Sequence, residues 1–232
     1  MRVGRVLSAS LLAGATALTV GIALPVGRAG AAPTSIPVVK NGEAGYTGSL
    51  PPSARTLIGE TTVASFNCKP STTESTTSVF DVGGLHVNPV AVEVVYGCNN
   101  GSPSVYYSVG GQEMSAAVGD QIRFFIKFRS DHETQKATDV TSGTSLSYSH
   151  GRKSFYPSTV FVGLLDSPSP VLGFKRMHFS DVAISGTPLA NLSNLQENEV
   201  TNGKSEPIIE PGPLSANGKG FTLLRVYPGS GS

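Results

Sequence analysis

The sequence predicts an all-β fold, a two-sheet antiparallel β-sandwich. Many short segments are rich in β-branched and aromatic residues and alternate between apolar and polar positions. Turn dipeptides such as Asn100-Gly101 and Asn217-Gly218 separate these segments, and no segment has sustained helical periodicity. Several short strands with turn signals between them are typical of a sandwich. The expected strands are 59–67, 78–85, 89–96, 104–109, 121–129, 137–141, 144–149, 159–165, 177–184 and 220–227.

Three of these segments are the most informative. In 121–129 one face carries Ile122, Phe124, Ile126 and Phe128, and the other carries the basic side chains, as in a strand with one face on a core and one in solvent. Ser142-Gly143 predicts a hairpin between two flanking strands. Residues 159–165 are apolar on both faces, which indicates a central strand. Residues 189–200 are expected to form either a short helix or a loop.

Residues 1–31 are interpreted as a cleavable signal peptide. Arg2 and Arg5 precede an apolar run over 6–26, and Ala29-Gly30-Ala31 supplies the small-residue pattern of a cleavage site. The alternative is an N-terminal membrane anchor, because the run is close to the roughly 20 residues that span a bilayer. Cleavage is favoured because small residues and a proline interrupt the run, so the protein is expected to be secreted and extracellular.

The rest of the chain is expected to form one domain. Residues 32–52 are rich in Gly, Pro, Ser and Thr and are expected to be loosely ordered, and 53–228 to form the β-sandwich. Without residues 1–31 the chain has 14 basic and 16 acidic side chains, a net charge of about −2. This balance argues against nucleic acid or an anionic membrane as a partner. A monomer is expected.

Cys68 and Cys98 are the only cysteines, and an exported chain with two cysteines is expected to contain one disulfide. His86, His132, His150 and His178 are scattered, with no pair at metal-ligand spacing. We therefore predict neither a metal site nor a cofactor.

Ala117-Val118-Gly119-Asp120 leads into strand 121–129, and Val82-Gly83 lies near the end of strand 78–85. These motifs are similar to the Ala-Gly-Asp strand entry and the Val-Gly turn of the glutamic peptidase (eqolisin, peptidase A4) family, which the order of the segments also resembles. The resemblance covers roughly residues 41–226 and implies a sandwich of the concanavalin/jelly-roll type. The other matching segments are 41–46, 62–68, 90–107, 179–184 and 214–222.

The resemblance also implies a catalytic pair on the concave face of one sheet. In the family a glutamate acts as general base on water, and a glutamine amide stabilises the oxyanion. The position expected for the glutamine is occupied by Ala91 or Val92, and that for the glutamate by Thr159 or Val160. A two-residue shift of the alignment would place Glu93 at the first position, which makes it a weak candidate. We expect this face to present only aliphatic and hydroxyl side chains at the catalytic positions.

The sequence therefore favours a pseudoenzyme, a secreted relative of the glutamic peptidases without peptidase chemistry. The chain contains no tryptophan, although the family lines its cleft with tryptophans; Tyr106 and Tyr107 are the expected remnants of a binding surface. Its concave face is expected to bind an extended peptide or a glycan. The alternative is an active acid endopeptidase that uses displaced residues such as Glu93.

Overall fold

The computed structural model describes residues 36, 38–41, 43–70, 73–84, 87–151, 156–166, 173–201 and 207–226. The expected signal peptide lies outside these ranges, and the compact unit discussed below spans residues 35–232. Sixteen strands and one 3-10 turn form within the described residues, and one continuous sheet folds over to make two packed layers. The predicted all-β, two-sheet antiparallel sandwich is confirmed.

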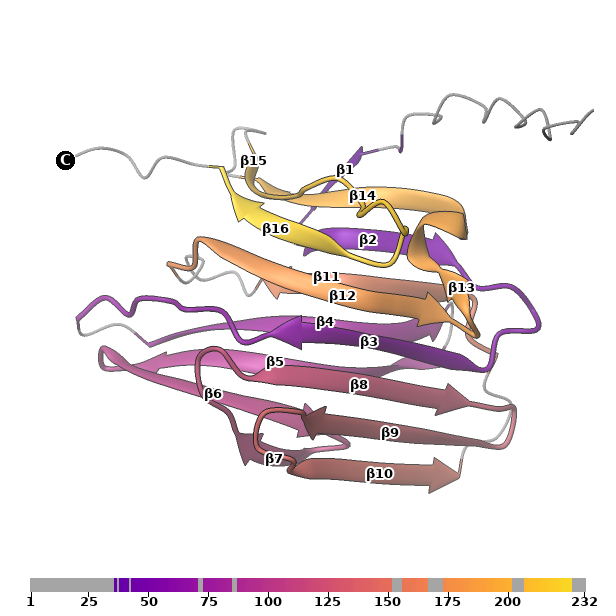
Figure 1. Cartoon of the computed structure of the whole chain (residues 1–232), viewed down its shortest axis with the longest axis horizontal. Coiled ribbons are helices and arrows are strands. Elements are labelled where there is room, and N and C mark those ends of the chain that lie inside the picture. Colours follow the sequence, from indigo (N-terminus) through magenta and orange to yellow (C-terminus); the bar gives the residue numbers. More distant parts are fainter. Residues whose placement is uncertain are drawn as a thin grey trace, which may run out of the picture. The chain divides into compact units, whose positions relative to one another are not determined.

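The front layer of Figure 1 contains six strands, which follow one another in the sheet. In sheet order they are β10 (Ser145–Gly151), β9 (His132–Asp139), β8 (Gln121–Phe128), β3 (Thr56–Thr62), β12 (Arg176–Ile184) and β16 (Phe221–Arg225). β9 and β10 form the hairpin predicted around Ser142-Gly143. Two small elements follow β12, the two-residue strand β13 (Thr187–Pro188) and the 3-10 turn η1 (Leu189–Asn191).

The rear layer continues the same sheet beyond β16. In sheet order it contains β15 (Pro207–Pro211), β14 (Ser193–Thr201), β2 (Glu43–Ser49), β11 (Thr159–Asp166), β4 (Glu74–Gly84), β5 (Val87–Asn99), β6 (Ser102–Val109) and β7 (Gln112–Ser115). β1 (Val38–Asn41) pairs in parallel with β14. β11, β4 and β5 lie behind β12, β3 and β8, and the strand axes of the two layers are nearly aligned (Figure 1), as in an aligned sandwich.

An aromatic cluster holds the two layers together. The Phe80 ring of β4 lies 4.4 Å from the Phe124 ring of β8 and 5.7 Å from the Phe179 ring of β12, between ring centroids. Phe179 stacks on Phe221 at 4.8 Å. A Cβ at Gly59 would overlap the Phe80 ring, so β3 can approach β4 only with glycine at this position. The inward alternation predicted for 121–129 is confirmed, because Ile122, Phe124, Ile126 and Phe128 are at most 2% exposed. Phe125, on the opposite face of β8, is half-buried.

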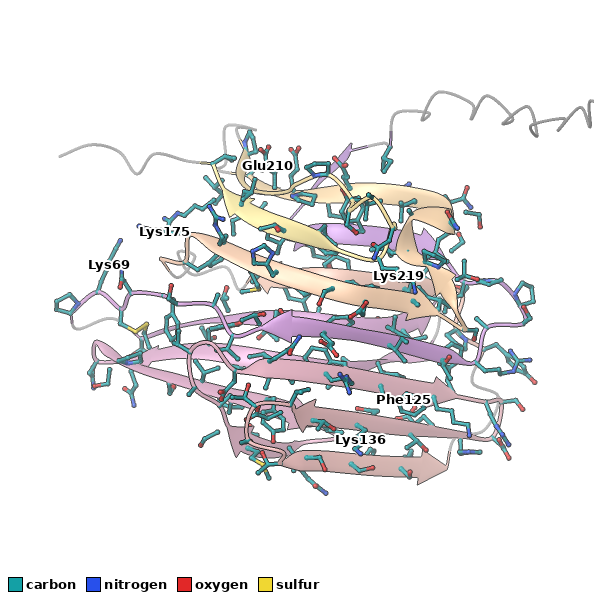
Figure 2. The ribbon with its side chains drawn as sticks, in the orientation of Figure 1. Lys69, Phe125, Lys136, Lys175, Glu210 and Lys219 are labelled. Carbon is teal, nitrogen blue, oxygen red and sulfur yellow. A yellow bond between two sulfur atoms is a disulfide. The ribbon has the colours of Figure 1, made fainter. Side chains whose placement is uncertain are left out.

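The Cys68–Cys98 disulfide joins the segment after β3 to β5 (Figure 2, yellow bond). The two Cα atoms are 5.6 Å apart. Beside the bridge, the Phe66 ring packs edge-on against the Tyr96 ring at 5.5 Å, and the Ala64 N–H donates to the Tyr96 hydroxyl at 3.3 Å. The bridge therefore fastens the chain between β3 and β4 to the rear layer.

Two sequence predictions about secondary structure are wrong. Residues 43–49, expected to be loosely ordered, form β2 in the middle of the sheet between β14 and β11. They escaped detection because Gly45 and Gly48 weaken the strand signal, although a Cβ at Gly45 would overlap the backbone of β11. Of residues 189–200, expected as a short helix or a loop, 189–191 form the 3-10 turn η1, but 193–200 belong to β14, whose Asn- and Glu-rich sequence becomes a strand by pairing with β2 and β15.

Within the described ranges, no helix is long and apolar enough to cross a membrane.

Candidate ligand-binding face

The outer face of the rear layer carries an unexpected group of carboxyl side chains. Successive strand residues point to opposite faces, so Val82, Val92 and Val160, each fully buried in the core, fix which positions point inward. Asp81 and its register partners Ala91 and Phe161 therefore point outward in one row across β5, β4 and β11. We call the outward surface of β2, β11, β4, β5 and β6 the polar face.

The positions predicted for the catalytic pair divide between the two faces. Val92 and Val160 lie in the core, so they are not available to a ligand. Ala91 and Thr159 point outward, and Thr159 is exposed at the start of β11. A methyl group and a hydroxyl group contain no base that titrates at ordinary pH.

Asp81, which the sequence analysis passed over, lies in the row between Ala91 and Phe161. Burial, followed by the charges of Glu43 and Glu93, raises the pKa of its carboxyl group to about 7. Its signal in the sequence is a single acid inside the apolar segment Val79-Phe80-Asp81-Val82. A charge at an interior strand position costs free energy unless a partner or a ligand compensates it, which is why such a residue is a candidate for function.

Glu93, on β5, is a neighbour of Asp81, which is on the adjacent strand β4. Val79 is the register partner of Glu93, and Asp81 is that of Ala91, so the two acids are diagonal neighbours on one face. Diagonal neighbours in an antiparallel pair have Cβ atoms roughly 7 Å apart, within reach of a shared ligand. Glu93 is half-buried, and burial also raises the pKa of its carboxyl group. The weak candidate from the sequence thus belongs to a carboxyl pair.

Side-chain amides lie just beyond the polar face, on β14, and are far from this pair. Asn198 of β14 is 3% exposed, and its Nδ2 donates to the Thr47 hydroxyl of β2 at 2.7 Å. β14 and β4 are separated by β2 and β11, so three strand spacings of about 4.8 Å put Asn198 roughly 14 Å from Asp81. One water molecule cannot contact both groups.

The two tyrosines predicted to bind ligand separate as well. Tyr106 of β6 is half-buried and points outward; burial, and then the charges of Glu113 and Glu93, raise the pKa of its hydroxyl. The prediction for Tyr107 is wrong, because adjacent strand residues point to opposite faces. Tyr107 is fully buried, and its hydroxyl contacts Met114 Sδ at 2.7 Å and Thr144 Oγ1 at 3.0 Å.

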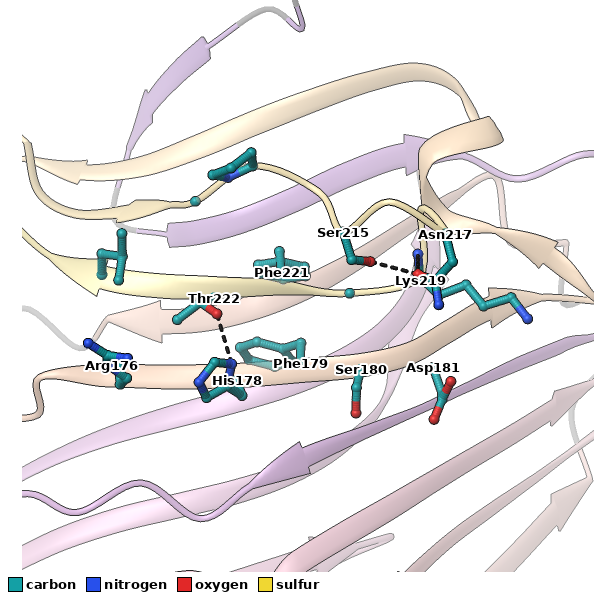
Figure 3. Close-up of a pocket in the computed structure, with 14 residues that line it drawn as sticks. Arg176, His178, Phe179, Ser180, Asp181, Ser215, Asn217, Lys219, Phe221 and Thr222 are labelled. Atoms are coloured by element: carbon teal, nitrogen blue, oxygen red, sulfur yellow. Dashed lines mark hydrogen bonds between the residues drawn. The ribbon is translucent and has the colours of Figure 1, made fainter.

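A second hollow lies on the outer face of the front layer, between β12, β16 and the turn that precedes β16 (Figure 3). Arg176 and His178 lie side by side along β12, and Lys219 lies near the other end of the hollow (Figure 3). His178 Nδ1 is hydrogen-bonded to Thr222 Oγ1 at 2.8 Å. A bulge in β12 places Asp181 on this surface with a φ of 53°. The hollow offers polar contacts but no adjacent acid–base pair.

The remaining histidines do not converge. His132 Nδ1 is bonded to Asp131 Oδ1 at 2.9 Å, and His150 stacks on Tyr148 with ring centroids 6.0 Å apart. His86 lies outside the described residues. Among the residues that the structure describes, no three His, Cys, Asp or Glu side chains are placed to hold a metal ion.

Comparison with known proteins relates this chain to peptidases by fold alone. No protein-family model and no curated protein sequence matches it. Among solved structures, SCP-B, a member of the eqolisin family in a complex with the tripeptide Ala-Ile-His, aligns over 79% of this chain and 98% of its own, with a TM-score of 0.61 and 12% identity. Scytalido-glutamic peptidase with a transition state analog inhibitor aligns over the same shares, with a TM-score of 0.59 and 12% identity. The chain therefore has a glutamic-peptidase-like fold.

Proposed function

We propose that this protein is an exported, non-catalytic binding protein that holds an extended peptide on the polar face. The peptide carries a basic side chain, and Asp81 and Glu93 receive it. The observation that carries the proposal is the carboxyl pair itself, two half-buried acids on adjacent strands of one face.

A cationic ligand is the natural partner of this pair. Burial and like charge together disfavour ionisation of Asp81, and a bound ammonium or guanidinium group offsets both effects. Binding of the cation lowers the pKa of Asp81, so complex formation below pH 7 releases a proton. The affinity accordingly rises as the pH rises from 5 to 8.

An extended peptide fits the fold better than a glycan does. SCP-B, which has the same fold, is in complex with a tripeptide. The outward row across β2, β11 and β4 presents the Thr47 hydroxyl, the Phe161 ring and the Asp81 carboxyl group, which an extended peptide lying across the strands can contact in turn. A glycan array on which the protein binds as tightly as it binds peptides would contradict this choice.

We propose that the protein is not a catalyst, because the two positions expected for the catalytic glutamine and glutamate carry neither an amide nor a carboxyl group. Ala91 and Thr159 supply no base, and the Asn198 amide is too distant to stabilise an oxyanion near Asp81.

A second candidate, acid peptide hydrolysis, is favoured by one specific observation. With a pKa of about 7, Asp81 is protonated at pH 4 to 5 and can donate a hydrogen bond to a carbonyl oxygen. When the pair holds a single proton, the carboxylate that remains can take a proton from water, a division of roles that two carboxyl groups perform in other acid peptidases.

Incubation of the mature protein with denatured casein from pH 2 to 8 separates the two candidates. The binding proposal predicts intact casein at every pH. Cleavage at acid pH that disappears in both Glu93→Gln and Asp81→Asn, but persists in the exposed control Glu113→Gln, would instead establish the hydrolase.

Export is part of the proposal and has its own test. Expression of the full chain in a secreting host should release a protein whose N-terminus is Ala32, as determined by mass spectrometry. Recovery of the chain only in membranes, with residues 1–31 still attached, would favour the anchor.

A further inference from the structure

A cavity at the open end of the sandwich is separate from the polar face. It lies where β2 and β8 end and β11 begins, and these strand ends are on the right in Figure 1. Its volume of about 880 Å³ is within the range of small-molecule sites. The lining comes from three separate segments, 50–55, 127–131 and 156–158.

The cavity has an apolar interior and an exposed aromatic ring at its lining. Leu50 and Phe128 belong to the buried core and close its inner end. Tyr156 is 72% exposed, an unusual state for so large an aromatic side chain, and Pro51 and Pro157 add rigid apolar rings to the lining. Such walls suit a ligand with an aromatic or aliphatic body.

The charge of the lining selects an anion. Arg55, Lys127 and Arg129 line the cavity together with one described carboxylate, Asp131. Asp131 already accepts a hydrogen bond from His132 at 2.9 Å. Arg55 is held against the lining by a hydrogen bond from Nη1 to the Pro52 carbonyl oxygen at 2.8 Å.

Lys127 lacks such a partner. Within the described part of the chain its side chain forms no ion pair or hydrogen bond, and it is half-buried, whereas the charge of Arg129 helps to lower the pKa of the nearby Asp131 carboxyl group. A half-buried ammonium group without a carboxylate beside it is costly unless a ligand supplies the anion.

From these contacts we infer that the cavity binds an amphipathic organic anion, in which an aromatic or aliphatic body contacts Tyr156 and the proline rings and a carboxylate contacts Lys127 and Arg129. The carboxylate can belong to a free acid or to the C-terminal residue of a peptide. Both sources present the same chemistry to the cavity.

Dansyl-phenylalanine is a suitable probe, because its fluorescence rises in apolar sites and the chain has no tryptophan to interfere. We expect saturable binding of dansyl-phenylalanine that is at least 10-fold tighter than binding of dansyl-phenylalaninamide, which lacks the negative charge. Equal affinity for the acid and the amide would overturn the inference without any variant being made.

Variants locate the site. The double variant Lys127→Gln/Arg129→Gln should weaken binding of the acid at least 10-fold, and Tyr156→Ala, at an exposed position, about 5-fold. The control Lys136→Gln removes a cation of β9 outside the cavity (Figure 2) and should leave affinity unchanged. If the control lost as much affinity as the double variant, the acid would be attracted by the overall charge of the protein and not by this cavity, which would contradict the inference.

A third arm distinguishes the two sources. Dansyl-Gly-Gly-Phe with a free C-terminus should bind more tightly than dansyl-phenylalanine if the ligand is a peptide terminus, and more weakly if it is a free acid. Failure of both compounds to bind would overturn the inference, and it would leave the polar face and its proposed function untouched.

Discussion

Asp81 of β4 and Glu93 of β5 are diagonal neighbours on one face of the sheet, each two residues along its strand from the other's register partner. Both carboxyl groups are half-buried, and both pKa values are raised. Two ionised carboxyl groups this close together destabilise the folded protein, and either protonation of one of them or binding of a cationic ligand removes that destabilisation. The proposed function depends on this relationship, and it has a consequence for stability that is independent of any ligand.

Asp81→Asn should remove the part of the pH dependence of stability that is due to the raised pKa of Asp81. Because the folded-state pKa is raised from 3.8 to about 7, the folded protein retains a proton between pH 4 and 7 that the unfolded chain has lost. The free energy of unfolding of the wild type therefore falls as the pH rises through this interval, because the folded protein holds Asp81 protonated more tightly than the unfolded chain does. The neutral variant should match the wild type at pH 3 and exceed it at pH 8, by about 2–4 kcal/mol in the free energy of unfolding.

Urea unfolding at half-unit pH steps measures this difference. Glu113→Gln, at an exposed position, is the control and should keep the wild-type slope. Parallel stability curves for the wild type and Asp81→Asn would refute the raised pKa.

Gly163→Ala should destabilise the sheet. A Cβ at Gly163 would overlap the Ala44 carbonyl oxygen and lie 2.8 Å from the Gly45 Cα, and neither backbone atom can move without separating β2 from β11. We expect a loss of about 3 kcal/mol, at the upper end for overpacked sites. Gly151→Ala, whose added Cβ would have no atom of the described residues within 4 Å apart from its chain neighbours, should change stability by less than about 0.5 kcal/mol. Equal effects at both positions, measured by thermal unfolding, would disagree with the close approach of the strands.

Thr76→Val should stabilise the protein. Thr76 is 2% exposed, and its hydroxyl oxygen has no hydrogen-bond partner among the described residues. Valine has the same shape without the buried polar group, so the free energy of unfolding should rise by about 1–2 kcal/mol. Thr77→Val, on the outward side of the same strand, should give no such gain. A loss of stability in Thr76→Val would mean that the hydroxyl is hydrogen-bonded.

Removal of the disulfide should lower stability substantially. The bridge closes a loop with a sequence separation of 30 residues, which corresponds to about 3–4 kcal/mol through the unfolded state. Cys68→Ala/Cys98→Ala should show this loss in urea unfolding, and dithiothreitol should then have no further effect. A loss below about 1 kcal/mol would contradict a stabilising role.

The sandwich could be predicted because its signals are local. The period of two in β8 depends on neighbouring side chains only, and its apolar face is buried as expected. β2 and β14 could not be predicted in this way, because close approach at Gly45 and Gly163 and pairing with distant strands make them strands. These contacts join residues more than 100 positions apart in the sequence.

The candidate site was predicted in part for the same reason. Glu93 could be named from the sequence, but its partner is defined by the register between β4 and β5, which a single sequence does not specify. A one-residue difference in alignment also decides whether Ala91 or Val92 occupies the position expected for the glutamine, and the two residues lie on opposite faces of the strand. The structure separates them, and it assigns Tyr106 and Tyr107 to opposite faces.

Calorimetric titration of a heptapeptide with a central lysine tests the central claim most directly. The peptide acetyl-Ala-Ser-Val-Lys-Val-Ser-Ala-amide should bind at least 10-fold more tightly at pH 8 than at pH 5, with proton release at the lower pH. Its norleucine counterpart, which lacks the charge, and the variant Asp81→Asn/Glu93→Gln should each lose that preference. Equal binding of the lysine and norleucine peptides to the wild type, or unchanged binding to the variant, would contradict a cation-binding role for the Asp81–Glu93 pair.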